Sequence, residues 1–383
     1  MDETLNAAEL ANLVARVFRP QERDEGLAII VDLPDERLPD NPDWAARRAM
    51  AAAWGDILAG AAAATGLDRV TVAWYRNAGG NNADLPDTCA LAGGGAVLAH
   101  ADDLAGHDAS SFTDLFASHS LILAPTELSA TAPLKVAVRA HEMRAATMPG
   151  FLPTMIPALR IDYTEVNRRV DLLKALLDVA TAAVVKTRCG GREHVLRLDL
   201  RHNEAHASGG LFPANGTAGN LPSGETYIVP YEGNLPGDPS LSAGELPVQF
   251  DDEVVLYRIA GNRAVAVLSR GPHSEREARY IRDEPAYANL SELGLGVLGD
   301  FGLKPTGSIL LDEKLGLHIA FGRSDHFGGS VGPGDFSSPD AVVHIDRVYI
   351  PEMQPDVAVA SLTLESTAGA REIMRDGRWI GIF

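Results

Sequence analysis

The sequence predicts an α/β protein whose first half alternates helices with strands and whose second half consists mainly of strands. In the first half, short apolar runs typical of buried strands alternate with segments of helical apolar spacing. After residue 190 the pattern changes to short strands separated by turns rich in Gly and Pro. A chain of 383 residues suggests two domains. We expect an N-terminal α/β domain over 1–190 with a parallel or mixed sheet, and a strand-rich α+β domain over 191–383.

The elements of the N-terminal domain follow from periodicity. Helical spacing predicts helices over 3–18 and over 42–64, the second beginning after Asn41-Pro42. Short apolar runs predict strands over 27–33, 70–75 and 121–124. Strands separated by helices predict a parallel or mixed sheet that helices cover.

The helical spacing returns over 162–186, where the glycines of Cys189-Gly-Gly-Arg192 are expected to end a long helix. Beyond this point we expect a loop over 207–224 and strands over 194–200, 254–259 and 263–268.

Composition excludes several classes of function. A net charge of -19 argues against nucleic acid or an anionic membrane as partner, because both bind clustered Lys and Arg. Two cysteines, Cys89 and Cys189, argue against a disulfide framework and against a cysteine-rich zinc site. The first residues lack a signal-peptide pattern, and no apolar run reaches the length of a membrane span, so we expect a cytoplasmic protein.

Acids and histidines of the last 160 or so residues stand in apolar or glycine-rich segments, where a charge is costly without a partner. His344 and Asp346 lie two residues apart in an expected strand over 341–350, so they share a face. They are either two metal ligands or a simple hydrogen-bonded pair. His318 lies in a second apolar strand and is either a ligand or a satisfied core histidine.

Glu292 and Glu225 extend this set. Glu292 precedes Leu-Gly-Leu-Gly, where a carboxylate at a helix N-terminus is one explanation, although the glycines argue against a regular helix and permit close approach of the backbone. Glu225 closes Asn220-Leu-Pro-Ser-Gly-Glu225 and opens an expected strand, a common place for a site residue. Taken alone, it is an acidic residue in a turn.

In order and spacing, these segments resemble the motifs of the aminopeptidase T (aminopeptidase S, thermophilic) family of metallopeptidases. The motifs are Asn-x-Pro-x-Gly-Glu, Glu-Leu-Gly-x-Gly, Asp-Glu-Lys followed by His-x-Ala-x-Gly, and His-x-Asp, found here at 220–225, 292–296, 312–322 and 344–346. The resemblance covers residues 215–350. It implies two divalent metals (zinc, cobalt, manganese or iron) held by Glu225, Glu292, His318, His344 and Asp346. It further implies hydrolysis of an amide or peptide bond by activated water, a peptide or small-molecule substrate, and a homodimer.

Three further residues are candidates for catalysis. Glu313 is either a general base, a group that orients a ligand, or the ion-pair partner of Lys314. Where the family has a tyrosine, this chain has Ser324-Asp325-His326-Phe327. Asp325 or His326 is therefore a candidate for proton transfer or metal binding, with a structural role in a turn as the alternative.

The resemblance also leaves an alternative chemistry open. The 2,5-dihydroxypyridine 5,6-dioxygenases belong to the same superfamily and hold one iron with two His and one Asp. His344 and Asp346, with His318 or His326, would supply that set. The presence of Glu292 favours the two-metal hydrolase. A non-enzymatic member that binds a small ligand is the third hypothesis.

Overall fold

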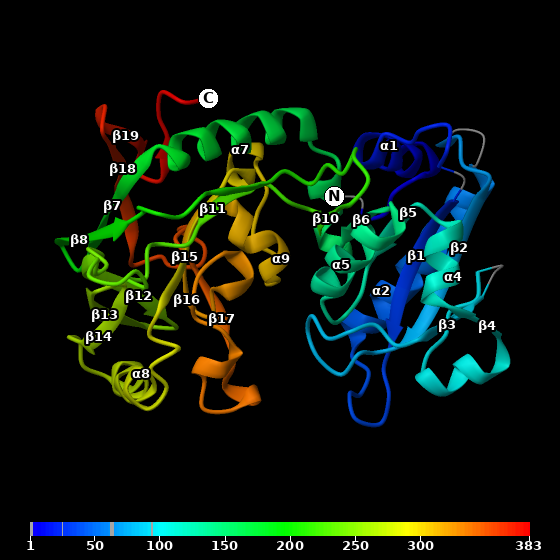
Figure 1. Cartoon of the computed structure of the whole chain (residues 1–383), viewed down its shortest axis with the longest axis horizontal. Helices are drawn as coiled ribbons and strands as arrows, with labels where there is room; N and C mark the ends of the chain where they lie inside the picture. The colour runs from blue at the N-terminus through cyan, green and yellow to red at the C-terminus, as the bar shows by residue number, and fades with distance from the viewer. Residues whose placement is uncertain (1–2, 25, 62–64, 93–94) are drawn as a thin grey trace. The chain divides into compact units, whose positions relative to one another are not determined.

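The computed structural model describes residues 3–24, 26–61, 65–92 and 95–383, and the chain forms two compact units (Figure 1). The first unit comprises Met1–Thr164, Ser208–Ser223 and Thr306–Leu311. The second comprises Glu165–Ala207, Gly224–Pro305 and Asp312–Phe383. The chain therefore returns to the first unit twice after leaving it, and the expected division at residue 190 stays a prediction. Among the described residues, no helix combines the length and the apolar character that crossing a membrane would require.

The first unit is built on a seven-stranded mixed sheet in the order β10-β6-β5-β1-β2-β3-β4. The strands from β10 to β2 run parallel, and β3 and β4 are antiparallel. This confirms the expected parallel or mixed sheet. The strands are β1 (Gly26–Leu33), β2 (Arg69–Arg76), β3 (Thr88–Leu91), β4 (Asp108–Ser111), β5 (Leu121–Ala124), β6 (Arg144–Thr147) and β10 (Thr217–Asn220).

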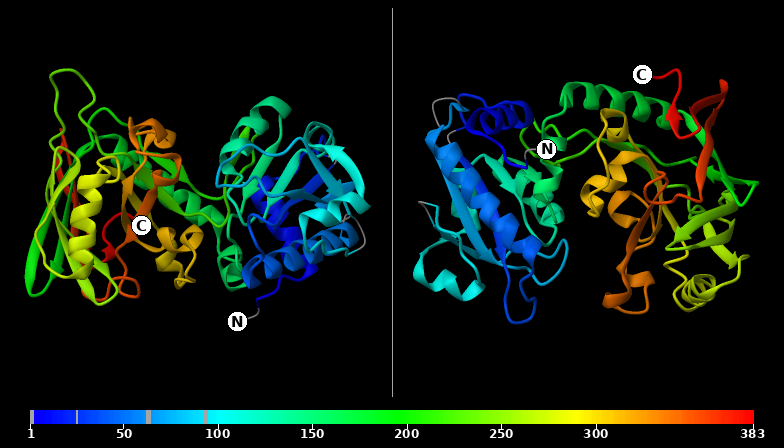
Figure 2. Two further views of the ribbon diagram at one scale, coloured as in Figure 1. Left: turned by 90° about the horizontal axis from the view of Figure 1, so that it is seen from below. Right: turned by 180° about the vertical axis from the view of Figure 1, so that it is seen from behind.

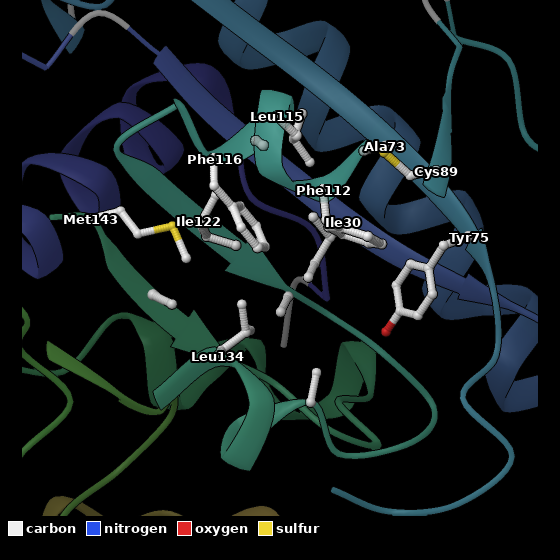
Figure 3. Close-up of a cluster of buried hydrophobic side chains, with 14 of the residues drawn as sticks. Ile30, Ala73, Tyr75, Cys89, Phe112, Leu115, Phe116, Ile122, Leu134 and Met143 are labelled. Atoms are coloured by element: carbon white, nitrogen blue, oxygen red, sulfur yellow. The ribbon is translucent and has the colours of Figure 1, made fainter. Parts of the chain in front are cut away.

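The core of this unit lies against the sheet. All eight residues of β1 are buried, as expected of a parallel strand covered on both faces. Phe112, Phe116 and Leu134 from the neighbouring helices pack with Ile30 and Ile122 of the sheet in one apolar cluster (Figure 3). The helices are α1 (Ala7–Phe18), α2 (Pro42–Gly60), α4 (Phe112–Ser118), α5 (Thr131–His141) and α6 (Ile156–Leu159).

The ends of the first two helices follow local capping. The helix expected from residue 3 begins at Ala7, because Asn6 and Glu9 form a capping box. The side chain of Asn41 accepts the Trp44 N–H and starts α2 before Pro42. The helix expected to residue 64 ends at Gly60, and positions 62–64 lie outside the described residues.

The second unit is rich in strands, as expected, and contains two sheets (Figure 2). Its eight-stranded sheet has the order β14-β13-β12-β8-β7-β18-β19-β20. The strands are β7 (Ala180–Cys189), β8 (Arg192–Asp199), β12 (Ala243–Phe250), β13 (Glu253–Ala260), β14 (Arg263–Val267), β18 (Ala358–Ser366), β19 (Gly369–Arg375) and β20 (Arg378–Trp379). The five-stranded sheet, β17-β16-β15-β11-β9, contains β9 (His206–Ser208), β11 (Glu225–Ile228), β15 (Leu290–Gly296), β16 (Leu317–Gly322) and β17 (His344–Val348). Helices α7 (Tyr163–Asp178) and α8 (Pro272–Asp283) complete the main elements.

The long helix expected over 162–186 is wrong beyond residue 178. Helix α7 ends at Asp178, and β7 begins at Ala180. Strand β7 lies between β8 and β18, so hydrogen bonds on both edges stabilise the extended backbone, which its Val and Thr residues also favour. Gly190 and Gly191 have φ of 56° and 75° and form the hairpin turn to β8 instead of a helix cap.

The loop expected over 207–224 is also partly wrong. It contains the end of β9 and all of β10, and β10 pairs with β6 in parallel. The local composition, rich in glycine and serine, is typical of a loop. Strand β10 forms because its backbone makes hydrogen bonds with β6, which is distant in sequence.

Candidate metal centre

One face of the five-stranded sheet carries all five predicted metal ligands. Directly opposed residues of antiparallel strands share a face, as do residues two apart in one strand. Glu225 opposes Gly296, and Gly294 opposes His318, which places Glu225, Glu292 and His318 together. Ala320 opposes Asp346 and Gly322 opposes His344, which adds the last two ligands to the same face.

Small residues on this face make room for the long polar side chains. A Cβ at Gly294 would lie 1.8 Å from His318 Nε2, so the imidazole lies directly over the bare backbone of β15. A Cβ at Gly296 would lie 2.3 Å from the carbonyl carbon of Lys314, whose backbone crosses at that point. Leu293 and Leu295 alternate with the glycines and are buried. Glu292 therefore lies in a strand and not at a helix N-terminus, and the glycines permit the close approach that their pattern suggested.

The ligand atoms form two groups that share Glu292. The first donor group is Glu225, Glu292 and His318, and the second donor group is Glu292, His344 and Asp346; within each, the donor atoms lie within 4.8 Å of one another. His318 Nε2 is 3.1 Å from Glu292 Oε1 and 3.6 Å from Glu225 Oε2. His344 Nε2 is 3.5 Å from Glu292 Oε2 and 3.5 Å from Asp346 Oδ1. Each oxygen of Glu292 thus faces a different imidazole.

The donor set suits divalent metals. Imidazole combined with carboxylate is a common ligand set for zinc, cobalt, manganese and iron. Glu225 Oε2 is buried and has no hydrogen-bond partner among the described residues. A buried carboxylate oxygen without a partner carries a desolvation cost that a bound cation would remove. The residues present therefore fit a metal.

The electrostatics of the centre also favour bound positive charge. Burial alone would lower the pKa of His318 and of His344, but the surrounding carboxylates raise these pKa values to about 10 and about 9. Burial raises the pKa of Glu292. Burial also opposes ionisation of Asp346, yet the nearby imidazoles bring its pKa below the ordinary value. The same negative field that holds protons on the imidazoles would attract metal ions, which bind in competition with protons.

Glu313 and Lys314 approach the centre from a short 3-10 turn (Glu313–Leu315) immediately before β16. The Lys314 side chain is fully buried, and its Nζ lies 3.3 Å from Glu225 Oε1 and forms an ion pair with Glu313. Burial raises the pKa of Glu313, and the Lys314 ammonium opposes this shift. The ion pair considered for Glu313 is thus present, and it lies at the metal centre.

Asp325 and His326 lie outside the two donor groups found in the described part of the chain. Both lie on a 3-10 turn (Asp325–Phe327). Arg323 Nε donates to Asp325 Oδ1 at 2.5 Å, and His326 Nδ1 lies 3.5 Å from the same oxygen. The His326 ring centre is 5.4 Å from that of His344, and burial followed by the charge of His344 lowers the pKa of His326 to about 4. His326 is therefore a neutral, partly exposed imidazole beside the centre.

Tyr227 was not among the predicted site residues. It follows Glu225 by two residues in β11 and therefore shares its face. Its ring packs between His206, at 5.2 Å, and Phe327, at 4.9 Å. Burial raises the pKa of Tyr227, as do the charges of the carboxylates of Glu292, Glu225 and Glu313. The sequence could have predicted this position, because two-residue spacing from Glu225 in a strand puts Tyr227 on the same face.

Comparison with known proteins supports the fold. No family model matches the sequence, and no curated protein matches it. Among solved structures, 2,5-dihydroxypyridine dioxygenase from Pseudomonas putida matches with a TM-score of 0.59 and 14% identity over 98% of each chain. Wild-type AmpT from Thermus thermophilus matches with a TM-score of 0.54 and 15% identity, over 98% of this chain and 99% of that one. This chain shares their fold. The expected similarity to aminopeptidase T and to 2,5-dihydroxypyridine dioxygenase is thus confirmed for the fold.

Proposed function

We propose that this protein is a metal-dependent hydrolase that uses two divalent metals to cleave an amide or peptide bond. The observation that carries this proposal is the pair of donor groups joined by Glu292. A shared carboxylate is the means by which a protein holds two cations close together without leaving either set of ligands incomplete. Two divalent ions held by these residues would activate water and would polarise the carbonyl that it attacks. The ligand types suit zinc, cobalt, manganese or iron.

The chain's own groups have separate roles in this proposal. Glu313, whose pKa burial raises, takes a proton from the attacking water and passes it to the leaving amine. Tyr227, on the ligand face of β11, orients the substrate carbonyl. His326 is neutral and partly exposed, so it donates a hydrogen bond to substrate at the outer side of His344. The substrate is a peptide or a small amide, and the similarity of fold to AmpT supports this choice.

The test begins with protein stripped by a chelator and reloaded separately with zinc, cobalt, manganese or ferrous iron. Amino-acyl p-nitroanilides and short peptides are then supplied without oxygen. We expect hydrolysis with at least one metal, and a loss of at least about 100-fold in Glu292→Gln, which removes a ligand from both groups. Glu36→Gln, an exposed position in the first unit, serves as the matched control. Absence of amide cleavage with every metal would contradict the proposal.

A mononuclear iron dioxygenase is the second candidate. The observation that favours it is the similarity of fold to the dioxygenase from Pseudomonas putida. In this alternative His344 and Asp346, with His318 or His326, hold one ferrous ion. Oxygen uptake with 2,5-dihydroxypyridine, dependent on iron and lost in His344→Ala, would select the dioxygenase. Inactivity in both assays would leave the third hypothesis, a non-enzymatic ligand-binding member.

A further inference from the structure

Lys314 introduces a fixed positive charge into the metal centre. Its side chain has no solvent exposure, and its backbone is held over Gly296. A buried ammonium is costly unless carboxylates compensate it, and here Glu225 and Glu313 do so. The first donor group therefore already shares one of its carboxylates with a cation that belongs to the protein.

The second donor group has a different environment. Among the residues that the structure describes, the cationic partners within ion-pair distance of Glu292 and Asp346 are the imidazoles of His318 and His344. A metal that binds the first group must therefore tolerate the Lys314 ammonium 3.3 Å from Glu225, whereas no lysine or arginine lies within ion-pair distance of Glu292 or Asp346 in the described part of the chain.

The charge balance opposes the second ion, whichever position it takes. Glu225, Glu292, Glu313 and Asp346 carry four negative charges when ionised, and Lys314 compensates one of them. One divalent ion then leaves the centre with one excess negative charge, and a second ion makes it positive. The second ion is therefore opposed by both the first ion and the lysine.

We propose that Lys314 makes the two metal positions unequal, so that the Glu292–His344–Asp346 position binds a divalent metal tightly and the Glu225–Glu292–His318 position binds a second one weakly. This inference rests on the metal centre of the proposed function and adds the order in which the positions fill. We expect the second ion to bind about 100-fold more weakly than the first. When the metal concentration is too low to fill the weak position, the protein therefore contains one ion per chain, at the tight position.

The experiment measures metal occupancy and does not depend on activity. Chelator-treated protein is dialysed against increasing Zn²⁺, and the ions per chain are counted by elemental analysis; Co²⁺ absorbance gives an independent titration. The variant Lys314→Met keeps the length of the side chain and removes its charge. Lys304→Met, an exposed lysine in the same unit, is the matched control.

For wild-type protein and Lys304→Met we expect one tight ion and one weak ion. In Lys314→Met the second ion is expected to tighten by at least about 10-fold. Two equal ions in wild-type protein, or an unchanged second affinity in Lys314→Met, would overturn the inference.

A second pair of variants covers the case in which Lys314→Met does not fold. Glu225→Gln is expected to retain the tight ion and lose the weak one, and Asp346→Asn to lose the tight one. Loss of the tight ion in Glu225→Gln would also overturn the inference. Unequal metal binding without amide hydrolysis would refute the proposed function alone, whereas hydrolysis with two equal ions would refute the role of Lys314 alone.

Discussion

Replacing Gly294 by alanine should disturb the metal centre without touching a ligand. The added Cβ would lie 1.8 Å from His318 Nε2, and ordinary contact requires about 3.4 Å, so the imidazole must move by about 1.6 Å. Such a shift cannot preserve both the 3.1 Å distance to Glu292 and the 3.6 Å distance to Glu225. A displacement of about 1 Å at a catalytic group can lower the rate about 100-fold.

We therefore expect Gly294→Ala to weaken metal binding by the first donor group and to lower amide hydrolysis about 100-fold. The extra methyl in a packed region should also reduce the free energy of unfolding by about 1–3 kcal/mol. Metal titration, rate measurements and urea denaturation check these three effects. Gly334→Ala is the control, because a Cβ there meets no atom within 4 Å. Unchanged metal affinity and stability in Gly294→Ala would refute the packing of His318 over β15.

Three further predictions concern the first unit. Phe112→Ala should lower the free energy of unfolding by about 3–5 kcal/mol in urea denaturation, because Phe112 is buried in the apolar cluster; a change below about 1 kcal/mol would contradict that packing. Arg144→Ala should lower the free energy of unfolding by about 3–5 kcal/mol in the same measurement, because it removes the ion-pair partner of the fully buried Asp24 carboxylate. Replacement of the exposed Arg188 should lower it by less than about 1 kcal/mol. Burial lowers the pKa of His119, so below pH about 6.5 the unfolded chain takes up a proton that the folded chain does not. The contribution of neutral His119 to the free energy of unfolding is thus complete above that pH and is lost as the pH falls, by at most about 1.4 kcal/mol per pH unit. His119→Gln should flatten this pH dependence of stability between pH 7.5 and 5. An equally steep dependence in the variant would show that His119 is not the group responsible.

The sequence alone was sufficient for the features that depend on local pattern. Strand periodicity placed His344 and Asp346 on one face, and turn chemistry placed Glu225 at the start of a strand. The alternation of helices and strands in the first half predicted the mixed sheet. These features need only the geometry of one strand or turn, or the order of neighbouring elements.

Only the tertiary structure decided which local pattern prevailed and which side chains meet. Residues 180–189 became a strand because β18, distant in sequence, pairs with one edge while β8, the next strand along the chain, pairs with the other. Strand register placed His318 over Gly294, and Asp325 forms a hydrogen bond with Arg323. The sequence motif contained Lys314 but could not show that its ammonium is buried beside Glu225. Pairing, burial and charge compensation depend on residues far apart in the chain, so they exist only once the sheet has assembled.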